Sequence, residues 1–147
     1  MKKFTFRLET LLQHRIKIEE KERDRFISLR RDLLNELNRK EKLCTRQTET
    51  LAELMLRKSC GSDSLEIGWY YRYLDRLAYE IKRTDLRIVE LEKNVEDQKQ
   101  IMIEASRKKQ MIENLKRKRH REHFVAMERE DQKNIDEIVV TRFAQRP

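Results

Sequence analysis

Apolar side chains recur every three or four residues along two long stretches of this chain. The first set comprises Phe4, Leu8, Leu11, Ile18, Phe26, Leu29, Leu33, Leu37, Cys44, Leu51 and Leu54, with polar gaps at Arg15, Glu22, Lys40 and Gln47. The second comprises Tyr70, Leu74, Leu77, Ile81, Ile88, Leu91, Val95, Met102, Ala105 and Ile112, with gaps at Thr84, Gln98 and Lys109. This is the narrow a and d spacing of a coiled coil, and it predicts two long helices.

One short break separates the two sets. The stretch Cys60-Gly61-Ser62-Asp63-Ser64 is where Gly, Ser and Asp cluster, and such a cluster marks a turn. Gly61 suits the left-handed position that ends a helix, and Asp63 followed by Glu66 has the spacing of a capping box. The pattern therefore predicts a first helix over about 4–60, a turn at about 61–63 and a second helix over about 64–141.

A short connection makes consecutive helices antiparallel neighbours. The predicted fold is therefore all-α, a long antiparallel two-helix coiled-coil hairpin that forms a single domain over 1–147. With the turn near residue 62, facing positions sum to about 124. Leu33 then faces Leu91, whereas Arg15 falls near Lys109. Two cations would face each other there, so we expect the helices to be poorly zipped, that is, poorly packed together, at this layer. Because the first helix begins near residue 4, roughly the last 20 residues of the second helix have no partner and overhang.

Composition narrows the functional classes. Charged residues make up 42% of the 147 residues, and there are two Gly and one Pro, which favours long helices over a globular domain. The glycines are too few for a phosphate-binding loop, no Cys/His cluster has zinc spacing, and two helices offer no pocket to desolvate a carboxylate. We expect no enzyme, catalytic residue, cofactor, metal or small-molecule ligand. The sequence predicts no membrane span and no signal peptide, which favours the cytoplasm.

Positive charge is concentrated late in the second helix. From Arg107 to Arg121 there are eight Lys or Arg against one acid, whereas residues 122–137 hold six acids and two bases. We call the first stretch the collar. A cationic collar attracts an acidic surface of a protein or a nucleic acid. A solvated helix face is the simpler interpretation of the same run.

Two groups of apolar residues exceed what one seam can bury. Five of the ten aromatic residues follow the turn, at Trp69, Tyr70, Tyr71, Tyr73 and Tyr79. They point in several directions around the helix, so some of them are exposed and either form a docking site or shield the turn. The overhang carries Phe124, Met127, Ile135, Ile138, Val139 and Phe143 among its acids. We expect it to bury them against another protein or a second copy.

Four sequence features together resemble the flagellar export protein FliJ family. They are the Phe-x-Phe-x-Leu opening at 4–8, the Tyr-x-x-Tyr-Leu-x-x-Leu-x-x-x-Ile run at 70–81, the Lys-Lys-Gln-x-x-Glu-x-Leu segment at 108–115, and the Ile-Asp-Glu-Ile ending at 135–138. The chain length and the hairpin plan also match. The resemblance therefore covers nearly the whole chain.

The resemblance implies a non-enzymatic, soluble component of the flagellar type III protein export apparatus. Such a protein is similar to the central stalk subunit of rotary ATPases. Its open end enters the hexameric ring of the flagellar export ATPase and promotes ring assembly and activity. The family also links the ring to the export gate membrane protein and escorts export chaperones. This implies a place at the cytoplasmic face of the inner membrane, at the flagellar base.

Candidate contact residues follow from these features. The resemblance places docking to the export gate at Tyr73 and Leu77, and the neighbouring aromatic residues Trp69 and Tyr70 join them. The collar, the Arg15/Lys109 mismatch and the acidic end predict the surface that contacts the ATPase ring. Its candidate residues are Arg15, Lys109, Lys116, Arg117, Lys118, Arg119, Arg121, Asp136 and Glu137.

Three other functions fit the pattern. The first is the equivalent stalk of a virulence type III secretion system. The second is a basic coiled coil that binds nucleic acid through the collar, although the collar lacks interleaved aromatic residues for base stacking. The third is a generic coiled-coil tether without an ATPase partner. Under the favoured interpretation, no nucleic acid is expected as a partner.

Overall fold

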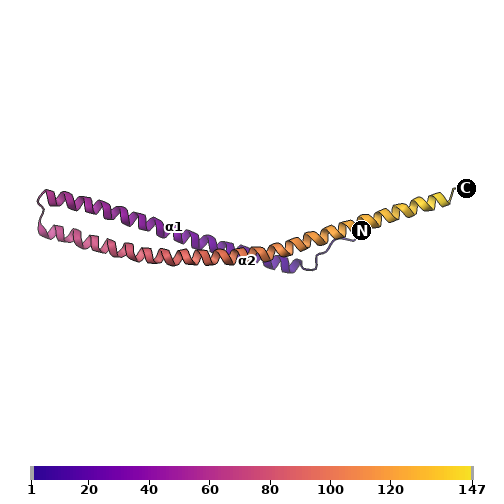
Figure 1. Ribbon diagram of the computed structural model, residues 1–147, viewed down its shortest axis with the longest axis horizontal. Coiled ribbons are helices and arrows are strands. Elements are labelled where there is room, and N and C mark those ends of the chain that lie inside the picture. The colour runs from indigo at the N-terminus through magenta and orange to yellow at the C-terminus, as the bar shows by residue number, and fades with distance from the viewer. Residues whose placement is uncertain (1, 147) are drawn as a thin grey trace. The chain divides into compact units, whose positions relative to one another are not determined.

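The protein is an all-α helical hairpin, as the sequence predicts (Figure 1). The computed structural model describes residues 2–146. Helix α1 spans Glu9–Ser59 and helix α2 spans Ser64–Ala144. The chain divides into two compact units. The turn unit comprises Lys21–Met102, and the terminal unit comprises the residues up to Glu20 and those from Ile103 onward.

The turn between the helices forms as the sequence predicts. Gly61 adopts a φ of 77°, in the left-handed region. The amide of Ser62 donates to the carbonyl oxygen of Arg57 at 3.2 Å, and the amide of Gly61 donates to that of Lys58 at 3.5 Å. These two bonds form a Schellman motif, which satisfies carbonyls at the end of α1. Asp63 then caps α2, because its carboxylate accepts from the amide of Leu65 at 3.4 Å.

The seam of the turn unit uses the predicted residues of α2 and most of the predicted residues of α1. Leu77 and Ile88 are buried at 3% and 7% exposure. On α1 the buried leucines are Leu43 and Leu54. The prediction was wrong for Leu37 and Leu51, which are 40% and 46% exposed. The seam of α1 runs one residue earlier at these two places, through Glu36 and Thr50.

Polar side chains fill several layers of this seam. Gln98 donates to the carboxylate of Glu22 at 2.5 Å. Lys40 lies 2.6 Å from the carboxylate of Asp85, and this hydrogen bond raises the pKa of Lys40 above its ordinary value. Such pairs contribute little net stability, but they fix the register because each donor meets its acceptor at only one offset of the helices.

The terminal unit contains the start of α1, the last part of α2 and a non-helical segment of residues 2–8, which we call the strap. Leu12 and Ala105 are buried between the helices at 4% and 8% exposure. Helix α1 begins at Glu9 rather than near residue 4. The ring of Phe4 packs edge-on against two rings of α2, at 5.0 Å from His120 and 5.6 Å from His123 between centroids. These contacts hold the strap against α2.

The poorly zipped layer that the sequence predicts in this unit does not form as expected. Lys109 pairs with Glu19 at 2.6 Å, one helical turn from the predicted Arg15. The Glu19 side chain is 4% exposed and that of Lys109 is 22% exposed. The predicted clash of two cations is therefore replaced by an ion pair within the seam.

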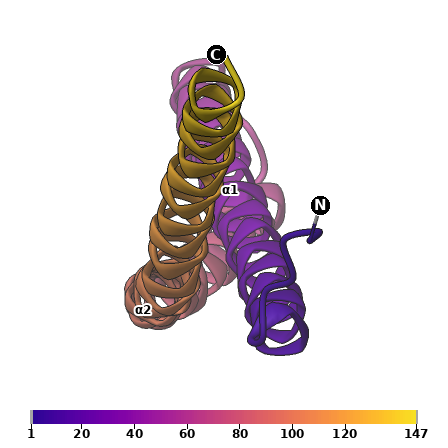
Figure 2. The ribbon, with the colours of Figure 1, turned by 90° about the vertical axis from the view of Figure 1, so that its right-hand side faces the viewer.

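Among the described residues of the terminal unit, no helix lies beside the last part of α2. From Glu128 to the end of α2, every side chain is exposed, and no other helix of the terminal unit runs along this segment in Figures 1 and 2. We call residues 124–144 the arm. Within residues 2–146, no helix is both apolar enough and long enough to cross a lipid bilayer.

Candidate interaction surfaces

The cationic collar divides into paired and exposed side chains. Lys109 and Lys116 are bound to carboxylates of α1, Glu19 and Glu9. Three other predicted contact residues are exposed and make no ion pair with a described residue: Arg117, Lys118 and Arg121. Arg119 lies 3.8 Å from Glu122 on the same helix. Arg15 is half-buried. The exposed cations of the collar without an ion pair to a described residue are therefore Arg107, Arg117, Lys118 and Arg121.

The Glu9–Lys116 pair ties the start of α1 to α2. The Nζ atom of Lys116 lies 2.8 Å from the Glu9 carboxylate, which also accepts from Gln13 at 3.1 Å. These hydrogen bonds, that of Lys116 first, lower the pKa of Glu9 below its ordinary 4.5. Because the folded pKa is lowered, the pair stabilises the fold above the unfolded pKa, and that contribution is lost as pH falls through the folded value.

We predict that Lys116→Met raises the pKa of Glu9 toward 4.5 but not fully to it, because Gln13 still donates. Titration of the Glu9 side-chain carboxyl by carbon NMR measures this shift. Lys118→Met is the matched control, since it removes an exposed ammonium from the same helix without touching Glu9. An unchanged Glu9 titration in Lys116→Met contradicts the role given to the pair.

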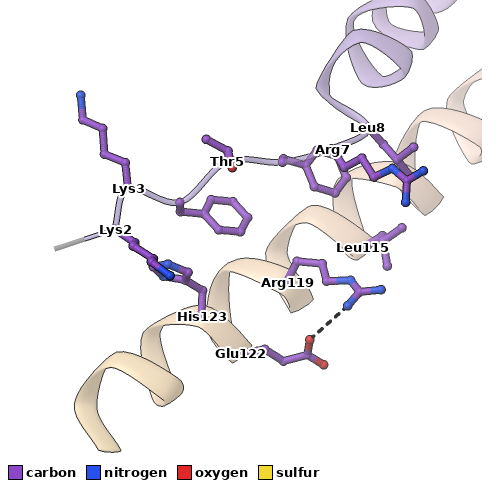
Figure 3. A pocket seen from close by; sticks show the side chains of 11 residues that line it. Lys2, Lys3, Thr5, Arg7, Leu8, Leu115, Arg119, Glu122 and His123 are labelled. Atoms are coloured by element: carbon purple, nitrogen blue, oxygen red, sulfur yellow. Dashed lines mark ion pairs between the residues drawn. The ribbon is translucent and has the colours of Figure 1, made fainter. Parts of the chain in front are cut away.

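The strap covers a hollow against α2 (Figure 3). The hollow has a volume of about 780 Å³. Its walls carry the cations Lys2, Lys3, Arg7 and Arg119, apolar side chains that include Phe4, Phe6, Leu8 and Leu115, and one carboxylate, Glu122. Figure 3 shows Arg119 turned toward Glu122, and Lys3 pointing away from α2. This hollow was not predicted from the sequence, although the Lys-Lys-Phe-x-Phe start supplies part of its cationic and aromatic wall.

The turn unit exposes the predicted aromatic patch. Trp69 is 62% exposed and Tyr73 is 37% exposed. Together with Leu65 and Tyr70 they line an open hollow of about 490 Å³ beside the turn. A concave apolar surface with two large aromatic side chains is typical of a docking site for a protein.

The other two residues predicted to dock the gate are positioned differently. Tyr70 is half-buried and donates its hydroxyl to the carboxylate of Glu53 at 3.5 Å. Leu77 is 3% exposed and lies within the seam. Tyr71, on another side of α2, accepts a hydrogen bond from Lys58, whose ammonium also lies 4.9 Å from the ring centroid. Trp69 and Tyr73 are therefore the members of the patch best placed to touch a partner.

The arm presents apolar and acidic side chains together. Ile135, Ile138 and Phe143 are 54%, 55% and 72% exposed. The predicted contact residues Asp136 and Glu137 are also exposed, and Asp136 accepts from Gln132 at 3.1 Å. Most of the stability of a helix in a protein comes from packing of its apolar face, and the apolar side chains of the arm are exposed instead. The arm therefore has the properties of a helix that docks onto another surface.

The comparison with protein families shows which family this chain belongs to. The family model described as Flagellar FliJ protein matches residues 3–147. The chain belongs to the flagellar FliJ protein family. No curated protein and no solved structure matches the chain. Membership makes the protein a component of the flagellar type III export apparatus.

Proposed function

We propose that this FliJ-family protein is the non-catalytic stalk of the flagellar export ATPase. Its collar and arm enter the hexameric ring and promote ring assembly and activity. Its aromatic patch docks to the export gate membrane protein. It also escorts export chaperones, and it works at the cytoplasmic face of the inner membrane. The observation that carries this proposal is that the arm in one unit and the aromatic patch in the other are both exposed, and these two surfaces differ in chemistry.

The surface of the terminal unit supports contact with the ring. The arm is helical over its whole length, and from Glu128 onward its side chains are exposed, so its apolar side chains are available to a second protein. Three exposed cations, Arg117, Lys118 and Arg121, precede an acidic arm. Charges of both signs can meet complementary charges around the inside of a ring and orient the helix as it enters.

The surface of the turn unit supports contact with the gate. Trp and Tyr side chains that are partly exposed beside a hollow are the usual anchors of protein interfaces. Trp69 and Tyr73 meet this description, whereas Leu77 contributes by holding the two helices together beneath them. Because the two surfaces belong to different units, a variant can remove one and leave the other intact.

A double-dissociation binding experiment tests the proposal. We predict that deletion of residues 124–147 abolishes binding to the export ATPase and leaves binding to the export gate unchanged. We predict the reverse for Trp69→Ala with Tyr73→Ala, with at least about a tenfold weaker affinity for the gate, because aromatic anchors commonly contribute 2 kcal/mol or more. The full chain is titrated against each purified partner by isothermal calorimetry.

The deletion starts at residue 124 so that Leu115 and Lys116, which contact the strap and α1, remain. Tyr79→Ala is the matched control for the patch, since Tyr79 is 67% exposed and does not line the hollow. If the deletion variant still binds the ATPase, the ring contact lies outside residues 124–147. A Tyr79→Ala variant as weak as the double variant shows that the patch is not the gate surface.

A further inference from the structure

Helix α1 of the turn unit carries a second apolar stripe beside its seam. Ile27, Leu34, Leu37, Leu51 and Met55 are 49%, 54%, 40%, 46% and 72% exposed. Each directly follows a buried or half-buried seam residue, so the stripe lies on one flank of the seam. Ile27 and Leu34 are seven residues apart, and Leu37 and Leu51 are separated by two such repeats. A seven-residue repeat stays on one side of a coiled-coil helix, so this flank fits another helix running alongside.

The arm of the terminal unit is a helix of the kind that fits such a flank. Its exposed apolar residues Phe124, Ile135, Ile138 and Val139 lie on one side, at spacings of three, four and eleven residues. Asp131 and Arg142 lie on the same side, four residues before Ile135 and four after Ile138. Neither Asp131 nor Arg142 forms an ion pair with a described residue.

The arm and the stripe match residue by residue when set parallel. On the arm, Asp131, Ile135, Ile138 and Arg142 follow one another at spacings of four, three and four. On α1, Arg30, Leu34, Leu37 and Glu41 have the same spacings. This register places Asp131 opposite Arg30, two aliphatic layers in the middle, and Arg142 opposite Glu41. All eight side chains are exposed, and Arg30 and Glu41 also lack an ion pair within residues 2–146.

We propose that a second copy of this chain is the partner of both surfaces. In the proposed dimer the arm of each copy packs in parallel on the α1 stripe of the other. Each copy offers one arm and one stripe, so a two-fold axis buries both pairs of surfaces at once. Opposite charges at the two ends of two apolar layers specify this register, because a shift by one turn brings Asp131 or Arg142 against leucine.

The dimer has a consequence for the stalk. An arm that is covered by a second copy is not free to enter the ATPase ring, so ring and dimer compete for it. The competition rests on the proposed function; the dimer does not. The free protein is then a stored form whose arm is shielded from other apolar surfaces until the ring displaces the second copy.

Sedimentation velocity of the full chain over a range of concentrations tests the dimer. We expect the parent protein to shift from monomer to dimer as concentration rises. Arg30→Glu alone and Asp131→Arg alone should each weaken the association at least about tenfold, because like charges then face each other twice. The double variant Arg30→Glu, Asp131→Arg should restore it. Arg31→Glu is the control, with the same charge change one position away on the exposed surface.

A cross-linking experiment checks the direction of the pairing. In a Cys44→Ser, Cys60→Ser background, chains carrying Leu37→Cys are mixed with chains carrying Ile138→Cys, and the disulfide-linked heterodimer is measured under mild oxidation. A second mixture, Leu37→Cys with Met111→Cys, is the control, because Met111 is exposed on α2 outside the arm. A heterodimer yield well above that of this control supports the register.

A monomer at every concentration, or equal weakening by Arg30→Glu and Arg31→Glu, overturns the proposal. Because no ATPase is present, this failure is separate from failure of the stalk function.

Discussion

Leu54→Ala should lower the free energy of unfolding by about 3 kcal/mol, because the removed methyl groups leave a cavity in the seam of the turn unit. Leu54 is 3% exposed, and it lies close to the turn, where the two helices must meet in one register. In a chain of this size the loss corresponds to a fall in the melting temperature on the order of 10 °C. Thermal and urea unfolding, followed by circular dichroism at 222 nm, measures it.

Leu56→Ala is the matched control for that experiment. Leu56 belongs to the same turn of α1 but is 65% exposed, so the same truncation should change stability by less than about 0.5 kcal/mol. Both variants alter helix propensity equally, which leaves burial as the difference between them. If the two variants unfold together, α1 does not present Leu54 to the seam in solution.

The seam of α2 could be read from the sequence because this helix has a single apolar stripe between the turn and the arm. The residues at its a and d positions include Leu77, Ile88 and Ala105, all buried in the structure. Even the polar gaps follow the pattern, since Thr84 and Gln98 are buried at 4% and 8%. Because α2 has a single apolar stripe, the three- and four-residue repeat alone identifies which polar residues lie in the seam.

The seam of α1 could not be read in the same way, because this helix carries two apolar stripes that are one residue apart. Leu33 lies in the seam and Leu37 lies in the flanking stripe, yet the two are four residues apart, which is an ordinary step of the repeat. Following the repeat therefore moves the prediction from one stripe to the other. The residue actually in the seam is Glu36, whose carboxylate lies 3.5 Å from Arg87 of α2. Only the position of that arginine on the partner helix makes the glutamate acceptable there, and periodicity on α1 does not contain that information.

The candidate surfaces show the same limit. Sequence reasoning predicted that some members of the aromatic cluster are exposed, because the cluster exceeds what one seam can bury, and Trp69 is one of them. It assigned Lys109 and Lys116 to a free cationic collar, but both are bound to carboxylates of α1. Charge counts along one helix do not show which cations the other helix neutralises. The strap was read as helix because Phe4 and Leu8 continue the spacing, whereas Phe4 instead packs on His120.

Removing the ammonium of Lys109 should destabilise the terminal unit more than removing the carboxylate that it neutralises. Lys109→Met takes the cation 2.6 Å from Glu19, whose side chain is 4% exposed and cannot turn to water. We expect it to cost about 2–3 kcal/mol, because a buried carboxylate then loses the ammonium that lies 2.6 Å away. Glu19→Leu should cost only about 1 kcal/mol, since the side chain of Lys109 is 22% exposed and can extend its ammonium into solvent.

The double variant Glu19→Leu, Lys109→Met separates this asymmetry from simple loss of contacts. It replaces the pair with two apolar side chains in a seam that already buries Leu12 and Ala105, so its stability should return to within about 1 kcal/mol of the parent protein. A double-mutant cycle from urea unfolding gives the coupling energy between the two positions. Additive losses, with the double variant the least stable of all, contradict a direct Glu19–Lys109 contact and favour the original expectation that this layer is poorly zipped.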